Sequence, residues 1–204
     1  MNQLSLFNEP AQKIKKAVYE YFFLISPDQA IRDAVRYLKK RLNAEVHIDS
    51  GDLHSVPHIS LFKTRTTDPL FNIDPFAAAL SKSHAFEIQI TGLGAFEQYN
   101  RKKTFYLKLK EQDIISSIFY TLLECRGDKS QTDFTPHLTI ARNISEGQLS
   151  WIQNLNDYNF KGEFFCTAIT VLKRQVNPNE SPKTRFEVYD EIHLLKRTNS
   201  FFGA

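Results

Sequence analysis

The strongest constraint on the fold is a short phrase that occurs twice in the chain. Residues 57–62 read PHISLF and residues 136–141 read PHLTIA, which places His58 and His137 79 positions apart. Each phrase has a proline, a histidine, an apolar residue, a serine or threonine, and a second apolar residue in the same order. The other four histidines have no serine or threonine two positions later. Chance is therefore a poor explanation, and two similar halves are expected.

Strand geometry gives the repeated spacing a physical meaning. Residues i and i+2 of a strand point to one face, and residues i+1 and i+3 point to the other. His58 therefore shares a face with Ser60, and His137 shares a face with Thr139. The apolar residues between and after them can anchor the opposite face in the core; these are Ile59, Leu61, Leu138 and Ile140.

The rest of the chain alternates between strand and helix patterns. Alternating apolar and β-branched or aromatic residues predict strands at 17–25, 57–62, 85–96, 104–109, 136–141, 163–173 and 185–195. Apolar residues at helical spacing predict helices at 27–42, 74–83 and 111–125, and a fourth after Ser145 that turns Trp151, Ile152 and Leu155 to the core. This order predicts an α+β fold made of two similar lobes.

Composition and length indicate one ordinary globular domain. The 204 residues are 42% hydrophobic, and 26 basic side chains nearly balance 23 acidic ones, which argues against a protein that coats nucleic acid through bulk charge. We expect a flexible tail at 1–15, a single bilobal domain at 16–198 and a C-terminal tail at 199–204. Cys125 and Cys166 lie far apart in apolar segments, as buried free thiols do. Without a secretory signal or a membrane-spanning apolar run, the chain is expected to be cytoplasmic.

The residue types in the two phrases indicate acid–base catalysis on an anionic substrate. Two histidines that titrate near neutrality, facing each other across the lobes, would supply an acid and a base, and two hydroxyl groups would donate to an anion. A metal site is the weaker interpretation, because no second ligand shares either strand face and hydroxyls are poor zinc ligands. A serine or threonine nucleophile would not explain why the arrangement is needed twice.

Three more side chains are candidates for substrate binding. Lys63 and Arg142 each follow their histidine by five positions, which would suit anion contacts at the strand ends. An odd offset nominally points away from the histidine face unless a bulge re-aims it, so both are interpreted as solvated strand-end charges. Tyr106 could stack on a base, although an aromatic residue in a half-buried strand more often serves packing.

The paired His-x-Ser/Thr-apolar motifs resemble those of the two-histidine (2H) phosphoesterase superfamily. The nearest similarity is to its 2'-5' RNA ligase and RNA 2',3'-cyclic phosphodiesterase branch, and it extends over about residues 17–195. It includes YFFLIS before the first helix, GLGAF at 92–96, TFYLKL at 104–109, and PHLTIAR, which ends at Arg142.

This resemblance implies two pseudo-symmetric lobes with antiparallel sheets around a central cleft and helices on the outside. It also implies a monomeric enzyme without metal or cofactor that acts on RNA ends or small nucleotides, in the hydrolytic or the reverse, ligating direction. By resemblance, His58 and His137 are the acid and the base, while Ser60 and Thr139 bind the phosphate. A small cyclic nucleotide or an ADP-ribose cyclic phosphate is an alternative substrate, and a non-catalytic RNA- or protein-binding module is an alternative function.

The N-terminal tail contains a second resemblance. Its residues Gln3, Leu4, Ser5, Leu6 and Phe7 are similar to the short peptide by which many bacterial replication and repair proteins bind the sliding clamp. The competing interpretation is an unbound tail or one that tucks against the domain.

Overall fold

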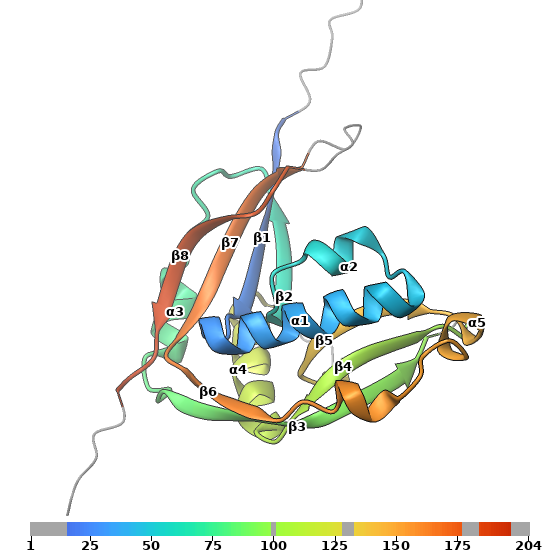
Figure 1. The fold of residues 1–204 in the computed structure, drawn as a ribbon. Coiled ribbons are helices and arrows are strands. Elements are labelled where there is room, and N and C mark those ends of the chain that lie inside the picture. The colour runs from blue at the N-terminus through green and yellow to red at the C-terminus, as the bar shows by residue number, and fades with distance from the viewer. Residues whose placement is uncertain (1–15, 99–100, 128–132, 177–183, 197–204) are drawn as a thin grey trace, which may run out of the picture.

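The computed structural model describes residues 16–98, 101–127, 133–176 and 184–196 (Figure 1). The strands are β1 (Val18–Ile25), β2 (Ile59–Thr66), β3 (Phe86–Glu97), β4 (Lys103–Leu109), β5 (His137–Ile144), β6 (Gly162–Cys166), β7 (Ala168–Val176) and β8 (Glu187–His193). The helices are α1 (Gln29–Val46), α2 (Ser50–His54), α3 (Asp74–Leu80), α4 (Gln112–Cys125) and α5 (Glu146–Leu149), with a 3-10 turn, η1, at Leu155–Tyr158.

The sheet has two four-stranded halves that meet at the motif strands. Its strand order is β6-β3-β4-β5-β2-β1-β7-β8, and all neighbouring strands are antiparallel. The first half contains β2, β1, β7 and β8, and the second contains β5, β4, β3 and β6. Between them, β2 and β5 are paired through Ile59 and Leu138 alone. The predicted α+β fold with two similar lobes is confirmed, and the two sheets are continuous across this narrow seam.

Each long helix packs on the half of the sheet to which its preceding strand does not belong. Helix α1 follows β1 and contacts β5 and β6, whereas α4 follows β4 and contacts β2. The side chains that α1 buries are spaced along one stripe; they are Ile31, Val35, Leu38, Lys39, Leu42 and Val46. Figure 1 shows α1 and α2 on the near side of the sheet and α3 and α4 on the far side. This exchange ties the two halves into one hydrophobic core.

Several predicted elements differ in detail. The predicted strand at 163–173 is two strands in different halves of the sheet: β6 is the edge strand of the second half, and β7 lies next to the edge strand β8 of the first half. The helix after Ser145 has only four residues, and Trp151 and Leu155 are exposed, while Ile152 packs against the core, so the prediction was wrong for the first two. Residues 146–161 form the short helix α5, the 3-10 turn η1 and the segments that connect them, so no continuous helical stripe turns these side chains to the core.

Some predictions concern the two ends of the chain, which lie outside the described residues. The predicted tails at 1–15 and 199–204 lie outside them, and so does the clamp-like peptide at residues 3–7. Clamp binding therefore stays a prediction. The monomeric state and the cytoplasmic location stay predictions as well. Among the described residues, no helix is both long and apolar enough to cross a membrane.

Candidate active site

The two motif strands have the same local structure. From Pro57 to Lys63 and from Pro136 to Arg142, burial follows one pattern: buried, intermediate, buried, intermediate, buried, buried, exposed. Each strand also contains a β-bulge after its hydroxyl residue. Phe23 pairs with Phe62 while Leu24 pairs with Ser60, so Leu61 is the extra residue in β2.

The bulge in β5 occurs at the corresponding position. Phe105 pairs with Ala141 while Tyr106 pairs with Thr139, which leaves Ile140 as the extra residue. A bulge shifts the alternation of side chains by one position. Histidine, hydroxyl residue and the cation five positions later therefore share a face in both strands.

This shift corrects the interpretation of Lys63 and Arg142 as side chains directed away from the histidines. The Lys63 ammonium lies 4.4 Å from the centre of the Phe22 ring. His58 makes an edge contact with the same ring at 5.1 Å between centroids, so Lys63 and His58 lie on one side of the sheet. Arg142 is close enough to both histidines to lower their pKa values.

Both histidines are held in the same orientation. The Nδ1 atom of His58 lies 2.7 Å from the carbonyl oxygen of Val56, and that of His137 lies 2.8 Å from the carbonyl oxygen of Thr135. A carbonyl can only accept, so Nδ1 carries the hydrogen in each ring. Nε2 is then left to accept a proton in the neutral ring and to donate one in the charged ring, as a general base or acid requires.

The environment lowers the pKa of both histidines. Burial is the largest cause for His58, followed by the positive charges of Lys39, Arg142 and Lys63. Burial is also the main cause for His137, with a smaller effect of Arg142. In both cases the carbonyl that accepts from Nδ1 opposes the shift, because it stabilises the charged ring.

The seam brings the two motifs together. Ile59 of β2 is paired with Leu138 of antiparallel β5. Extending this register by one residue places His58 across from Thr139, and His137 across from Ser60. Residues directly opposite in an antiparallel pair have Cβ atoms about 5 Å apart. Each imidazole thus neighbours the hydroxyl of the other half.

Aromatic rings border the site on the second half as well. Tyr106 lies edge-on to His137, with 5.3 Å between ring centroids, and Phe96 does the same at 5.4 Å. The Tyr106 ring also covers Gly94, where a Cβ atom would lie only 2.6 Å from it. Tyr106 is therefore beside the histidine, as a base-stacking side chain should be, although it also packs.

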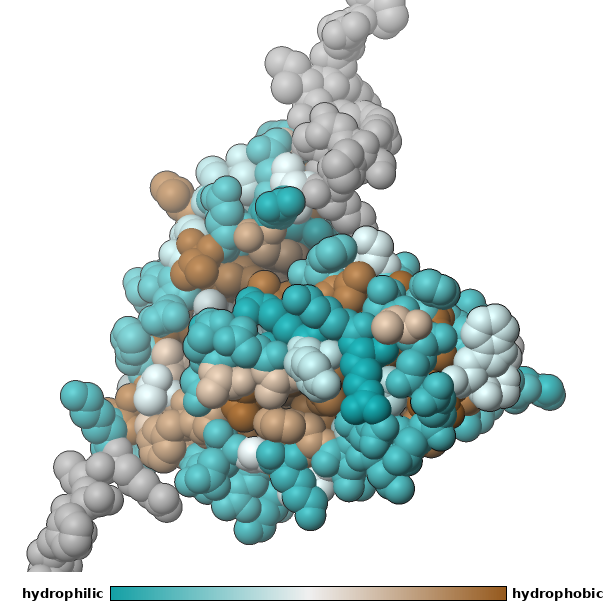
Figure 2. Space-filling view, viewed as in Figure 1, coloured by the Kyte–Doolittle hydropathy of each residue, from teal (hydrophilic) through white to brown (hydrophobic). Residues whose placement is uncertain are grey.

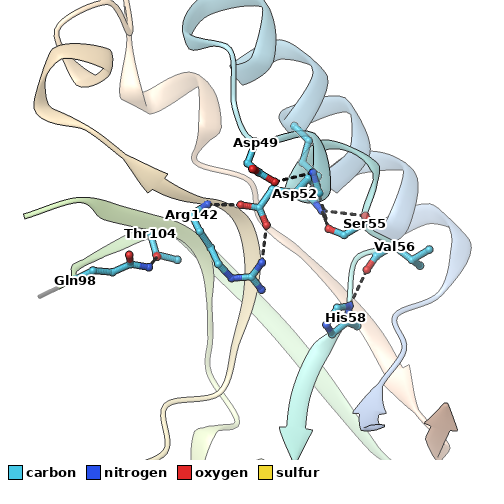
Figure 3. A network of polar contacts seen from close by, with 10 residues as sticks. Asp49, Asp52, Ser55, Val56, His58, Gln98, Thr104 and Arg142 are labelled. Atoms are coloured by element: carbon cyan, nitrogen blue, oxygen red, sulfur yellow. Dashed lines mark hydrogen bonds and ion pairs between the residues drawn. The ribbon is translucent and has the colours of Figure 1, made fainter. Parts of the chain in front are cut away.

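A buried polar network connects Arg142 with the segment that leads into His58 (Figure 3). Asp52 of α2 accepts the backbone N–H of Arg142 at 2.7 Å and its guanidinium at 2.5 Å. The Ser55 hydroxyl donates to the backbone carbonyl of Asp52 at 3.0 Å. Because α2 precedes β2 and Arg142 belongs to β5, this carboxylate links the two halves beside the seam.

Lys39 of α1 completes the network. Its ammonium donates to the backbone carbonyl of Ser55 at 3.0 Å and to the hydroxyl at 2.7 Å. The side chain is almost fully buried, at 1% exposure, and burial lowers its pKa to about 8 although the nearby Asp52 opposes the shift. A buried lysine with a pKa lowered this far is unusual, and its charge adds positive potential near His58.

Sequence reasoning did not find Asp52 or Lys39. A signal for Lys39 was present, because it follows Val35 by four positions and so lies on the apolar stripe of α1. Asp52 gave none, since it belongs to a polar stretch whose five-residue helix has no periodicity. Within the described residues, no three His, Cys, Asp or Glu side chains converge as metal ligands would.

Comparison with known proteins identifies the family and the fold. The family model of the 2'-5' RNA ligase superfamily matches residues 27–178. No curated protein matches the chain by sequence. The structure is similar to TT0787 of Thermus thermophilus, with a TM-score of 0.62 and 14% identity over 87% of this chain and 99% of that one. It is also similar to apo LigT of E. coli, with a TM-score of 0.59 and 15% identity over 88% and 99%.

Proposed function

Because the chain belongs to the 2'-5' RNA ligase superfamily, we propose that it is a metal-independent phosphodiesterase that acts on RNA or nucleotide 2',3'-cyclic phosphates or 2'-5' linkages. His58 and His137 serve as its general acid and base. The observation that carries the proposal is the duplicated geometry: two imidazoles with Nδ1 engaged and Nε2 available, on the same sheet face as two hydroxyls and two cations.

For a 2',3'-cyclic phosphate, the two imidazoles can carry out the two proton transfers that hydrolysis requires. One imidazole takes a proton from water as the water oxygen forms a bond to phosphorus. The other gives its proton to the ribose 3' oxygen as the bond between that oxygen and phosphorus breaks, which leaves a 2'-phosphate. The two protons are exchanged between solvent and the pair of histidines, so the resting state is restored without an external cofactor.

The phosphoryl oxygens gain negative charge along this path. The hydroxyls of Ser60 and Thr139 donate to the two non-bridging oxygens, and the charges of Lys63 and Arg142 stabilise them electrostatically. Asp52 fixes the Arg142 guanidinium and backbone through two hydrogen bonds, which limits the reorganisation needed when the substrate arrives. Preorganised donors of this kind are usually the largest single contribution to catalysis of such reactions.

A nucleotide is the substrate class with most support. A structure of E. coli LigT, which shares this fold at 14% identity and a TM-score of 0.57 over 87% of this chain and 98% of that one, contains 3'-AMP. The aromatic rings beside both histidines would border a base or ribose bound between the motifs. Small cyclic nucleotides and ADP-ribose cyclic phosphates remain the alternative substrates.

The test is turnover in the presence of a metal chelator. We expect cleavage of a 2',3'-cyclic nucleotide or of a 2'-5'-linked oligoadenylate, and a loss of at least about 1,000-fold in kcat for both His58→Ala and His137→Ala. His84→Ala is the matched control, because His84 lies outside the motifs. If no substrate of the panel is turned over, or if either motif variant keeps the normal rate, the proposed function is wrong.

A further inference from the structure

Beyond the reacting phosphate, the first half of the sheet carries a second group of charged and aromatic side chains. We call it the Glu20 face; it consists of Glu20, Phe22, Lys63, Arg65, Arg174 and Phe186. Strand pairing puts its members together, since Glu20 is opposite both Arg65 and Arg174, and Phe22 is opposite Lys63. The other face of these strands is closed by α3, which packs Phe76 against Phe23.

A single buried carboxylate organises the two arginines. Arg65 Nε donates to one oxygen of Glu20 at 3.0 Å, and Arg174 Nε donates to the other at 2.8 Å. Burial tends to raise the pKa of Glu20, but the hydrogen bonds from the two arginines outweigh it and lower the pKa. Glu20 thus stays charged and holds both guanidinium groups against the sheet. Among the described residues of this face, the two arginines alone outnumber the one carboxylate, which leaves an excess of positive charge.

Two aromatic rings lie between these cations. The centre of the Phe186 ring is 4.3 Å from the Arg174 guanidinium carbon, and 5.6 Å from the centre of the Phe22 ring. Lys63 lies over Phe22 and, at 5.7 Å, also near Phe186. Figure 2 shows hydrophobic and hydrophilic side chains adjoining on the side of β7 and β8 that faces away from α3. Alternating cations and flat rings are the features by which proteins bind single-stranded nucleic acid.

The Glu20 face begins at the catalytic motif and leads away from it. Phe22 contacts the His58 ring directly. Lys63 and Arg65 are two residues apart on β2, so they lie about 7 Å apart along the strand, with Arg65 farther from His58. In the second half, the carboxylate beside Arg142 is Asp52, which pairs with that arginine, and the nearby Thr104 accepts a neutral hydrogen bond from Gln98 at 2.7 Å (Figure 3).

We propose that the Glu20 face binds the RNA nucleotides that precede the reacting 3' end, so that the substrate is an RNA oligomer and not a mononucleotide. The phosphate next to the terminal nucleotide contacts Arg65, and a base stacks on Phe186. The inference rests on the proposed function for the position of the RNA end. A protein partner is disfavoured, because the face combines a surplus of cations with rings at the very edge of a phosphate-handling site.

The test separates binding from turnover. The affinity of a labelled RNA trinucleotide with a 2',3'-cyclic end is measured by fluorescence anisotropy across a salt series with the wild type, Arg65→Gln and Phe186→Leu. In parallel, kcat/KM is compared between this trinucleotide and 2',3'-cyclic AMP. Arg65→Gln leaves Glu20 paired with Arg174, so the fold is expected to tolerate it. Arg41→Gln is the matched control, an arginine equally engaged with acidic side chains but on α1.

We expect the wild type to favour the trinucleotide, and each Glu20-face variant to reduce this preference at least about fivefold. Arg65→Gln should also flatten the dependence of log affinity on log salt by about 0.7, the contribution of one phosphate contact in a single strand. Arg41→Gln should change neither quantity. If Arg65→Gln behaves like Arg41→Gln, as a protein-docking face would predict, the inference is overturned. RNA that binds with the expected dependence on Arg65 but is not turned over would refute the proposed function and support the binding face.

Discussion

The buried Lys39 should give the protein a specific dependence of stability on pH. Its pKa is about 8 in the folded chain, against an ordinary value of 10.5. Because the pKa of Lys39 is lower in the folded state than in the unfolded state, keeping the buried side chain charged lowers the free energy of unfolding. This cost is fully present below pH 8. That loss is relieved as the pH rises from 8 to 10.5, where the folded state has released a proton that the unfolded state still binds.

The size of the effect follows from the same two values. At about 1.4 kcal/mol for each pH unit, the lowering from 10.5 to about 8 corresponds to about 3 kcal/mol. No discount for solvent screening applies, since the side chain is 1% exposed. Lys39→Met keeps the length and apolar stem but has no titrating group. The unfolding free energy of the wild type relative to this variant should therefore increase by about 3 kcal/mol between pH 7 and pH 10.5.

Urea denaturation of both proteins at several pH values measures this difference. Taking the difference between the two proteins cancels the titration of every other group that the substitution leaves unchanged. A rise that begins near pH 8 supports the reasoning, and a difference that stays constant between pH 7 and pH 10.5 refutes it. Lys39→Met should also raise the pKa of His58, because a positive charge that now lowers it is removed.

Two further predictions concern the phosphate donors and the backbone. Ser60→Ala and Thr139→Val should each lower kcat about 100-fold, as the loss of one donor to a developing charge does, while Thr121→Val on α4 should not change steady-state kinetics. Gly92→Ala should lower the unfolding free energy by about 2 kcal/mol in urea denaturation, because Gly92 has φ of 132° and a Cβ atom would lie 2.1 Å from Asn159 Oδ1. Gly147→Ala, which has open space around it, should be close to neutral, and equal losses for the two glycines would contradict the account.

In the paired motifs, the sequence predicts which side chains share a strand face over a short distance but not past a bulge. Alternation within a strand correctly places His58 beside Ser60 and His137 beside Thr139, because only three consecutive residues are involved. It fails for Lys63 and Arg142, since the parity is reset by Leu61 and Ile140. A bulge depends on how the neighbouring strand pairs, and residues of ordinary strand character such as leucine and isoleucine do not mark it in the sequence.

Two tertiary features could not be predicted from the sequence: the pairing of β2 with β5, and the packing of each long helix on the opposite half of the sheet. The pattern of elements predicts two similar lobes, but the packing of α1 on the second half and of α4 on the first is a tertiary property. Asp52 is important only because that packing brings α2 to β5, where the carboxylate meets Arg142. Local patterns contain no information on such a contact across 90 residues.

The central claim, that two histidines work as an acid and base pair, is tested most directly by the pH dependence of kcat/KM for a 2',3'-cyclic nucleotide. The active form has one imidazole neutral and the other protonated, so the profile should be bell-shaped. Since the free protein lowers the pKa of both rings below 6.5, its maximum should lie on the acid side of pH 6.5. A profile that rises with pH to a plateau, without a descending limb, would contradict a two-histidine mechanism.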